Sequence, residues 1–565
     1  MSRHLISPLI ASLLLFFVLP VTIYAAGRKT IYVATDMHVM DSSLIVSEGE
    51  ALAFTFAHDR KMLRYSTEAF EAFVDSAIIH HADVLLLSGD LTKDGERVSH
   101  EHVARTLEKA RKAGVECYVI PGNHDISNSN ACYYDGDRTY PAESVTAQKF
   151  ADIYRHFGYD DTIVRDPHSL SYVCEPVSGL VLLCIDASIY GDVLNKGVIG
   201  RPTLEWILKQ IDDAKARGKQ VFAMMHQQLA DHVDGLNDMM DTFAIKDADD
   251  IACLLAEHGV HLVFTGHTHY SDAATIWNDK HTASLTDVTT GSIITYPSYY
   301  RVLTVSGDGS CLTIDSHRIT TLPSQPDYTR YGRQFMENNL YTFFYTVSSI
   351  YWESINSLMK RYCKDIHLLF TSITFRLPKT PEELVDLVFR YLESFIIKGF
   401  TIVYEGNEHH QDAYENMYKE LKRGVYNILG EIIENDIYVL GRPMARRKAC
   451  DMVMEEVMPM MKSILEDLNY IGTVHENHTD DLHFNIDLQT GRMLTDAEFE
   501  NRMEKTVEQP ITIRTSHGHI RVEGAINVSI YNLQGQIVSN CNEVFVPTGS
   551  YIVHADDQIK KIRVR

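Results

Sequence analysis

The first half of the chain, residues 27–322, alternates short apolar runs with segments of helical periodicity. Runs such as KTIYVA, VLLL and LVLLC have the length and composition of buried strands. The segments EAFEAFVDSAIIHHAD and HEHVARTLEKARKAG space their apolar residues as amphipathic helices do. Repeated alternation of strand and helix predicts an α/β fold in which sheet faces are covered by helices.

Polar residues follow these apolar runs at the point where each run ends. In VIPGNHD the apolar residues stop at Pro121-Gly122, and an amide, an imidazole and a carboxylate come next. The same arrangement recurs in ATDMHV, SGDLT, MMHQQ and TGHTH. Because ligands of α/β sheets bind beyond the carboxyl ends of the strands, we expect these polar residues to meet at one edge. The candidates are Asp36, His38, Asp90, Asn123, His124, Asp125, His226, His267 and His269.

The hydrophobic pattern then changes, and residues 328–500 are predicted to form a mainly helical accessory domain. In KTPEELVDL, Thr380 is a predicted N-cap and Pro381 occupies the first helical position. The aromatic segment YTFFYTVSSIYWESINSLM is interrupted by charged residues, so we interpret it as a core or interface helix. A membrane span is the alternative interpretation.

Residues 510–565 alternate apolar and polar side chains at every second position, in VSIYNLQGQIV and SYIVHADDQIKKIRV. Turn residues stand at Gln534-Gly535 and again from Pro547 to Gly549. This pattern predicts a small antiparallel β module at the C-terminus.

Composition and charge narrow the class of protein. A chain of 565 residues is too long for one ordinary core, and its 45% hydrophobic and 23% charged residues are typical of globular domains. The formal net charge of −24 argues against general binding of nucleic acids, whose backbones are also negative. It does not exclude a small phosphorylated substrate, because a bound metal ion reverses the local field.

The N-terminal residues 1–26 have the features of a secretory signal peptide. Arg3 gives a positive start, Leu9–Val21 is apolar, and Ala25-Ala26 are the small residues expected at a cleavage site. The alternative is an uncleaved membrane anchor, for which the apolar stretch is short. We therefore expect the protein to be secreted, periplasmic or displayed at the cell surface.

The nine cysteines of the chain form no CxxC motif and no dense framework. Cys174 and Cys184 flank a predicted hairpin turn at Ser178-Gly179, where they could form a disulfide. Two buried free thiols are the alternative.

The polar candidates together form a set of metal donors. Apart from Asp125, this set of two carboxylates, one amide and four or five imidazoles suits two divalent ions such as Mn, Fe, Zn or Co. Asp36 and His38 are two positions apart, so on an extended segment they point the same way, as do His267 and His269. Asp90 lies between the others in sequence order and could bridge both ions.

The order of these motifs resembles the calcineurin-like metallophosphoesterase family. That family's pattern is Asp-x-His, Gly-Asp, Gly-Asn-His-Asp/Glu, His and Gly-His-x-His, and every element is present here in order. The segment TTGSIITYPSYYR resembles the family's last core strand. The resemblance implies a two-sheet αββα sandwich with a dinuclear metal centre, over a domain at residues 27–322.

The resemblance also implies a role for each candidate. One ion would take Asp36, His38, Asp90 and His269, and the other Asp90, Asn123, His226 and His267. His124 would contact the phosphate or protonate the leaving group, and Asp125 would orient His124. A hydroxide bound by both metal ions would attack phosphorus.

Two further features refine the resemblance. The Tyr that purple acid phosphatases carry soon after the Gly-Asp element is missing from GDLTKDGE, so the cyclic-nucleotide and phospholipid diesterase-like subgroup is the nearer pattern. The C-terminal module resembles the sorting domains of Bacteroidetes-type secreted proteins, which implies export machinery as a partner. A plain β accessory domain is the alternative.

We therefore expect an exported, metal-dependent phosphoesterase that acts on a small-molecule phosphate ester or a phospholipid headgroup, with phosphodiesters favoured. The alternatives are a broad phosphomonoesterase and a non-catalytic surface or adhesion protein on the same fold. A second histidine-rich stretch, with His475, His478 and His483, is either another metal site or a solvated loop.

Overall fold

The computed structural model describes two units of the chain, Lys29–Arg502 and a C-terminal unit that begins at Met503. The described residues are 29–160, 164–191, 197–232, 244–369, 375–405, 411–434, 438–439, 442–443, 445–470, 481–505, 512–516, 519–523, 528–533, 536–539, 543–555 and 558–564. The predicted signal peptide at residues 1–26 lies outside them.

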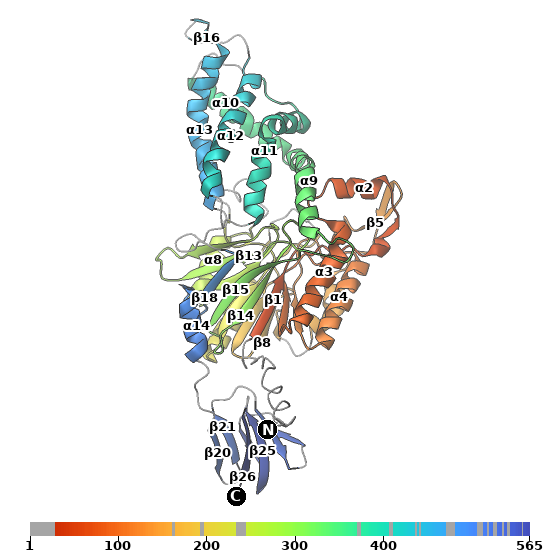
Figure 1. The fold of residues 1–565 in the computed structure, drawn as a ribbon, viewed down its shortest axis with the longest axis vertical. Helices are drawn as coiled ribbons and strands as arrows, with labels where there is room; N and C mark the ends of the chain where they lie inside the picture. Colours follow the sequence, from red (N-terminus) through yellow and green to blue (C-terminus); the bar gives the residue numbers. More distant parts are fainter. Residues whose placement is uncertain are drawn as a thin grey trace, which may run out of the picture. The chain divides into compact units, whose positions relative to one another are not determined.

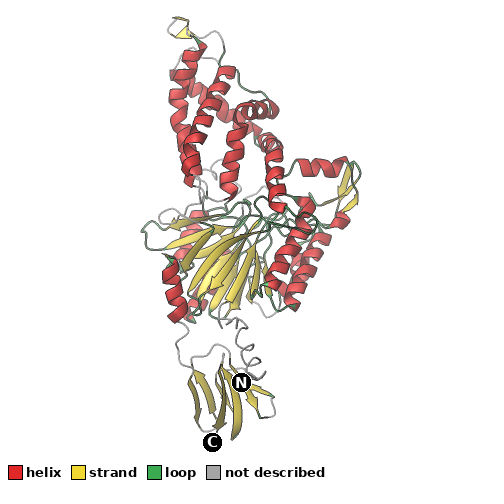
Figure 2. Ribbon diagram, viewed as in Figure 1, coloured by secondary structure: helices red, strands yellow, loops and turns green. Residues whose placement is uncertain are grey.

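The first unit contains two seven-stranded sheets, seen as the yellow arrows at the centre of Figure 2. In the first sheet the order is β19-β18-β15-β14-β1-β3-β4. β1, β3 and β4 are parallel, whereas the strands from β14 to β19 add antiparallel to the other side of β1. The strands are β1 (Lys29–Ala34), β3 (Val84–Leu87), β4 (Glu116–Val119), β14 (Tyr299–Val305), β15 (Cys311–Arg318), β18 (His483–Asp487) and β19 (Met493–Leu494).

The second sheet has the order β12-β13-β11-β10-β9-β8-β7. Its central strands β9, β10, β11 and β13 are parallel, and antiparallel strands close both edges. The strands are β7 (Val164–Arg165), β8 (Tyr172–Val177), β9 (Leu180–Cys184), β10 (Gln220–Met224), β11 (Leu262–Thr265), β12 (Asp272–Trp277) and β13 (Ser284–Thr289).

The side-chain alternation of the buried strands explains how the sheets are covered. In β9, Leu180, Leu182 and Cys184 enter a core shared with β1 and β3 of the first sheet. Val181 and Leu183 point the other way, into a second core with residues of α6 (Arg201–Ala216) and α8 (Ala248–Glu257). The two sheets therefore face each other across one core, and helices pack on the outer face of the second sheet.

The outer face of the first sheet is covered by α3 (Ser66–Ile79) and α4 (Arg97–Lys112), which run side by side in Figure 1. Their buried stripes include Phe70 and Phe73 on α3, and Val103 and Leu107 on α4. The predicted αββα sandwich is therefore confirmed.

Smaller elements decorate the connections of the sandwich. A three-stranded sheet has the order β2-β5-β6. The elements are η1 (Ser42–Leu44), β2 (Ile45–Ser47), α2 (Glu50–Ala57), η2 (Leu63–Tyr65), β5 (Cys132–Asp135), β6 (Arg138–Pro141), α5 (Ala147–Ile153) and η3 (Arg155–Phe157).

A helical region follows β15, as predicted (red in Figure 2). It contains α9 (Tyr328–Ile350), α10 (Trp352–Leu369), α11 (Pro381–Glu405), α12 (Gln411–Ile432) and α13 (Arg446–Tyr470), with the short strands β16 (Tyr438–Val439) and β17 (Arg442–Pro443). α9, α11, α12 and α13 share an apolar core. The Oγ1 atom of Thr380 accepts a hydrogen bond from the Glu383 N–H at 3.2 Å, so Thr380 is the N-cap of α11.

Within the described residues, no helix is long and apolar enough to cross a membrane. The aromatic segment predicted as one stretch is divided between α9 and α10.

The end of the helical region differs from the expected boundary at residue 500. After residue 481 the chain returns to the first sheet, where β18 pairs antiparallel with β15 from Cys311↔Asp487 to Asp315↔His483. Phe484 and Ile486 of β18 are buried in the core between the sheets. These two apolar residues complete an otherwise open sheet edge, and α14 (Asp496–Lys505) follows them.

The C-terminal unit contains two antiparallel sheets, with orders β20-β21-β24 and β23-β22-β25-β26. The strands are β20 (Thr512–Ser516), β21 (His519–Glu523), β22 (Val528–Asn532), β23 (Ile537–Ser539), β24 (Glu543–Phe545), β25 (Gly549–Ala555) and β26 (Gln558–Val564). Their buried apolar residues form a small separate core. The alternating pattern therefore forms antiparallel strands, while the predicted turn at Gln534-Gly535 lies outside the described residues.

The cysteine pair of the predicted hairpin is reduced. β8 and β9 are joined at Gly179 as expected, but the opposing positions are Cys174↔Leu182 and Tyr172↔Cys184. Cys174 and Cys184 are free thiols, as in the second interpretation, although only Cys184 is buried and Cys174 is partly exposed.

Candidate metal centre

Backbone hydrogen bonds tie the first two motif loops together. The Asp36 N–H donates to the Gly89 carbonyl at 3.0 Å, and the His38 N–H donates to the Asp90 carbonyl at 2.9 Å. These bonds continue the pairing of β1 with β3 beyond the strands themselves. The loops after the two strands therefore present Asp36, His38 and Asp90 side by side.

The backbone of these loops is not extended, which corrects the expectation for Asp36-x-His38 and His267-x-His269. The φ angles are 53° at Asp36, 40° at His38, 49° at Asp90, 72° at His267 and 70° at His269. A left-handed conformation is costly for residues other than glycine and recurs at functional sites. Alternate left-handed residues, rather than a straight strand, turn both members of each pair toward the same point.

The first group of donor atoms converges on Asp36. Its Oδ1 atom lies 3.2 Å from Nε2 of His269 and 3.7 Å from Nε2 of His38. The two Nε2 atoms are 3.3 Å from each other. Asp36, His38 and His269 therefore form one group whose donor atoms could share a metal ion.

The second group of donor atoms lies around His226. Its Nε2 atom is 3.0 Å from Oδ1 of Asn123 and 3.3 Å from Oδ2 of Asp90. His267 joins Asp90 and His226, with donor atoms that all lie within 4.8 Å of one another. The structure therefore places the four residues expected around the second ion together.

Asp90 connects the two groups. Its Oδ2 atom lies 3.5 Å from Nε2 of His38 in the first group and 3.3 Å from Nε2 of His226 in the second. Its Oδ1 atom accepts a hydrogen bond from the His124 N–H at 2.9 Å. A carboxylate in this position can bridge two ions.

Two observations indicate that the donor set fits a pair of divalent transition ions. The Oδ1 atom of Asp36 is buried and has no hydrogen-bond partner within the described chain, although nitrogen atoms surround it. The Nδ1 atoms of His226 and His269 are engaged with the Ser88 carbonyl at 2.9 Å and with Thr295 Oγ1 at 3.2 Å. Outer contacts of this kind leave the Nε2 lone pairs directed at the shared centre.

Burial sets the protonation of most of these imidazoles. It lowers the pKa of His38 and of His267 to about 3, and that of His269 to about 4. These rings are therefore neutral at pH 7, which is the form that binds metal ions. His226 differs: burial lowers its pKa, but the Asp90 carboxylate outweighs burial and raises the pKa to about 9.

The ring of His124 is held by residues other than the one expected. Its Nδ1 atom lies 2.9 Å from the Lys93 carbonyl oxygen and 3.0 Å from Oδ1 of Asp94. Burial lowers the pKa of His124, but the carboxylates of Asp90 and Asp94 outweigh burial and raise this pKa above its usual value. Asp94, and not Asp125, orients His124.

Asp125 supports the surrounding backbone instead. Its carboxylate accepts hydrogen bonds from the N–H groups of Leu91 at 3.0 Å, Thr92 at 2.9 Å and Gly122 at 2.9 Å. The Thr92 hydroxyl donates a further bond at 2.8 Å. Asp125 therefore locks the loop after β3 to the loop after β4, and the role predicted for it as the orienting partner of His124 is wrong.

A charged cluster lies behind His124 and was missed from the sequence. Lys93 forms ion pairs with Asp94 and, at 3.8 Å, with Glu96, and all three side chains are largely buried. Burial raises the pKa of Asp94, but the hydrogen bond to His124 and the charge of Lys93 outweigh it and hold this pKa well below its usual range. The available signal was the run KDGE, which holds three charged residues and follows the Gly-Asp motif after Leu91 and Thr92.

The buried residue His232 was also missed from the sequence. Its Nδ1 atom lies 2.6 Å from Oδ2 of Asp272, and its Nε2 atom lies 3.5 Å from Oδ2 of Asp287. Burial lowers the pKa of His232, but the two carboxylates outweigh burial and raise it to about 10. His232 is therefore a buried cation with two partners.

The other histidine-rich stretch gives a surface contact where it is described. His483 lies 2.5 Å from Asp315 and 3.2 Å from Asp496, and it is exposed. His475 and His478 lie outside the described residues.

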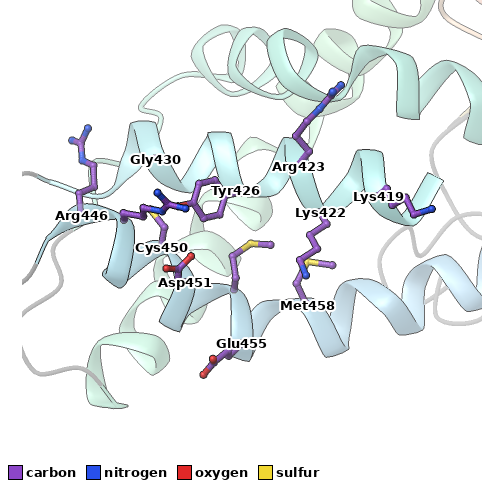
Figure 3. A pocket seen from close by; sticks show the side chains of 12 residues that line it. Lys419, Lys422, Arg423, Tyr426, Gly430, Arg446, Cys450, Asp451, Glu455 and Met458 are labelled. Atoms are coloured by element: carbon purple, nitrogen blue, oxygen red, sulfur yellow. The ribbon is translucent and has the colours of Figure 1, made fainter. Parts of the chain in front are cut away.

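A cavity of about 1000 Å³ lies between α12 and α13, away from the motif residues (Figure 3). Lys422 and Arg423 of α12 and Arg446 of α13 are among its basic lining residues, and Tyr426 and Met458 line it as well. No candidate residue of the metal centre contributes to this cavity, so it is not the candidate active site.

Comparison with known proteins agrees with the motif order. Residues 29–271 match the family model described as calcineurin-like phosphoesterase. The UDP-2,3-diacylglucosamine hydrolase of Serratia proteamaculans (strain 568) is 26% identical over 212 residues, which cover 36% of this chain and 75% of that protein. The 3',5'-cyclic adenosine monophosphate phosphodiesterase of Escherichia coli (strain K12) is 21% identical over 262 residues, covering 45% and 80% respectively.

Among solved structures, a dimetal phosphatase from Danio rerio covers 51% of this chain and 96% of its own, at 13% identity and a TM-score of 0.35. The matched residues 29–271 include every candidate from Asp36 to His269.

Proposed function

We propose that this chain, whose residues 29–271 form a metallophosphoesterase domain, hydrolyses small phosphodiesters at two divalent metal ions. The observation that carries the proposal is the position of Asp90. Its Oδ2 atom lies 3.5 Å from His38 Nε2 and 3.3 Å from His226 Nε2, between two separate groups of donors. Asp36 and His269 would complete one ion site, and Asn123 and His267 the other.

Two ions held at these residues would neutralise phosphate oxygens and make a water nucleophilic near neutral pH. The other chemical requirement is a proton for the departing alkoxide, and His124 is placed to supply it. Its Nδ1 atom is occupied by the Lys93 carbonyl and Asp94, which leaves Nε2 for the substrate. With 21% of its side chain exposed, His124 is accessible from solvent, unlike the buried His38.

The raised pKa of His124 suits this role, because a general acid must carry a proton at the working pH. Asp94 and Asp90 stabilise the protonated ring. Asp94 also fixes the ring plane, so that the proton on Nε2 keeps its direction during the reaction.

The preference for diesters rests on the relatives. One relative is named a cyclic adenosine monophosphate phosphodiesterase. A phosphodiester carries a single negative charge and leaves an alkoxide, so it benefits from both the ions and the His124 proton. A small phosphodiester or a phospholipid headgroup is therefore the proposed substrate class.

Hydrolysis of two chromogenic esters tests the proposal. Metal-stripped protein would be reloaded with Mn²⁺ and assayed with bis-p-nitrophenyl phosphate and with p-nitrophenyl phosphate. We expect kcat/KM for the diester to exceed that for the monoester by about tenfold or more, since tenfold needs only ~1.4 kcal/mol of selective stabilisation. A preference for the monoester would support a phosphomonoesterase, and no turnover of either would support a non-catalytic role.

We also propose that the chain is exported. The apolar stretch Leu9–Val21, with small residues at Ala25-Ala26, supports a cleaved signal peptide. The separate antiparallel core of the C-terminal unit is consistent with a module that export machinery could recognise. Fractionation of the producing cell, with sequencing of the mature N-terminus, tests this; an intact residue 1 in the cytoplasm would contradict it.

A further inference from the structure

The loop between α2 and η2, residues 58–62, packs against the support of the metal centre. The Met62 N–H donates to the Ile294 carbonyl at 2.7 Å, and the residue that follows Ile294 contacts a donor of the centre directly. That residue, Thr295, contacts the Nδ1 atom of His269 at 3.2 Å through its hydroxyl. The loop is therefore adjacent to the first donor group.

The helical region holds this loop in place. The side-chain amide of Asn339 on α9 donates to the Phe56 carbonyl at 3.2 Å and to the Asp59 carbonyl at 3.1 Å. On α11, Tyr404 accepts a hydrogen bond from Nη1 of Arg60 at 3.0 Å. The loop at residues 58–62 therefore contacts both the support of the metal centre and the helical region.

Arg60 is the least neutralised charge of this loop. Its guanidinium lies 5.5 Å from the ring centroid of Phe343, and among the described residues it has no carboxylate partner. Lys61, in contrast, lies 3.5 Å from Oδ2 of Asp59. A guanidinium has five N–H donors, and Tyr404 uses one of them.

The charges of Arg60 and Lys61 act on the metal centre. Burial is the main cause of the low pKa values of His38 and His269, and the positive charge of Lys61 lowers both further. The charge of Arg60 also lowers the pKa of His269. Asp59, which pairs with Lys61, acts on the same two histidines with the opposite sign, so Arg60 supplies the uncompensated positive charge that an anion at the centre would experience.

We propose that Arg60, assisted by Lys61, binds a second acidic group of the substrate, next to the phosphodiester that reacts. Arginine suits this task because its planar fork pairs with phosphate and carboxylate oxygens in a bidentate manner. Tyr404 and Phe343 are positioning residues that hold the guanidinium for this contact. The inference rests on the proposed phosphodiesterase function, and it gives the helical region a part in substrate selection.

A matched pair of substrates tests the inference. Thymidine 5'-(p-nitrophenyl phosphate) and its 3'-phosphorylated form have the same leaving group and differ by one acidic group. With Mn²⁺-loaded full-length protein, we expect the 3'-phosphate to raise kcat/KM about tenfold, mainly through KM. In Arg60→Ala, the ratio of kcat/KM with the 3'-phosphate to kcat/KM without it falls to about 1. In Tyr404→Phe this ratio takes an intermediate value.

Arg64→Ala is the matched control, because Arg64 lies in the same segment but pairs with Glu48 at 3.0 Å. This variant should keep the wild-type ratio. Equal ratios in wild type and Arg60→Ala would overturn the inference while leaving the phosphodiesterase proposal intact. An Arg64→Ala ratio that falls as far as that of Arg60→Ala would also overturn it, because the effect would then be a general one of surface charge.

A binding measurement separates this inference from catalysis. Calorimetry with thymidine 3',5'-bisphosphate and thymidine 5'-phosphate should give about tenfold tighter binding of the bisphosphate to wild type, and no difference in Arg60→Ala. If neither chromogenic substrate were hydrolysed, the proposed function would fail, and this binding difference would still decide the role of Arg60. Equal binding of the two nucleotides by wild type would overturn it.

Discussion

The metal centre and the His232 pocket use the same residue types to opposite effect. In the centre, four imidazoles share the two carboxylates of Asp36 and Asp90. At His232, one imidazole lies between the two carboxylates of Asp272 and Asp287. Burial lowers the pKa of His38 to about 3, whereas the paired carboxylates raise the pKa of His232 to about 10.

Burial outweighs the shared carboxylates in setting the pKa of His38, His267 and His269, whereas nearby carboxylates outweigh burial at His232 and, within the centre, at His226. Protonated His232 supplies a positive charge within its site, so one of the two carboxylates is neutralised without an external cation. Asp287 is further satisfied by the N–H groups of Leu229 at 2.7 Å and Ala230 at 3.0 Å. In the centre, the neutral rings point at the unbonded Oδ1 atom of Asp36, and an external cation is needed to complete the site.

The largest expected effect is that of Asp90→Asn. Loss of the bridging carboxylate should lower kcat/KM for bis-p-nitrophenyl phosphate by about 10³-fold or more, because both ions are misplaced. Metal content measured by mass spectrometry should fall in parallel. Asp315→Asn, at a partly exposed carboxylate that pairs with His483, is the control and should retain activity and metal.

The next effect is that of His124→Ala. We expect the rate to fall about 10²-fold to 10⁴-fold for diesters with alkyl leaving groups, which need a proton. The loss should be much smaller for diesters with a p-nitrophenolate leaving group, because this group departs without a proton. Metal content should stay at the wild-type value; an equal loss of rate for both leaving groups would argue against the acid role.

The variant His232→Gln tests the second region of the comparison, the buried site of His232. Removing the buried cation takes a positive charge away from the Asp272 and Asp287 carboxylates, so we expect a loss of about 3 kcal/mol in the free energy of unfolding at pH 7. Because the folded pKa of His232 is raised to about 10, its contribution is complete below about pH 6.5 and is lost as pH rises through 10.

The difference in thermal midpoint between wild type and His232→Gln should therefore shrink from pH 7 to pH 10. A difference that does not change with pH would show that His232 acts through packing and not through charge.

The smallest expected effect is that of Asp94→Asn. We expect about a tenfold loss of rate, since the ring of His124 keeps its contact with the Lys93 carbonyl. The basic limb of the pH–rate profile should move to lower pH, because one of the two carboxylates that raise the pKa of His124 is gone. Asp125→Asn should instead lower the thermal midpoint, and an unshifted pH profile in Asp94→Asn would contradict the assignment.

The donor residues could be found from the sequence because each one follows an apolar run directly. The carboxyl ends of parallel strands such as β1 and β3 meet at one sheet edge, so the chain order of the motifs carries their spatial arrangement. The partner of His124 could not be found in this way. Asp125 is its neighbour in sequence, but successive side chains diverge, and the carboxylate of Asp94 reaches the ring from the preceding loop.

The return of the chain to the first sheet was also beyond the sequence pattern. β18 is short, and its apolar residues Phe484 and Ile486 are buried because β18 pairs with β15, which lies far earlier in the chain. Pairing across such a separation depends on the shape of the open sheet edge, which a local pattern does not contain.

The most direct test of the account is anomalous scattering from crystals of the full chain grown with Mn²⁺. The account predicts two peaks that share Asp90, one contacted by Asp36, His38 and His269 and the other by Asn123, His226 and His267. A single peak, or manganese bound away from Asp90, would contradict it.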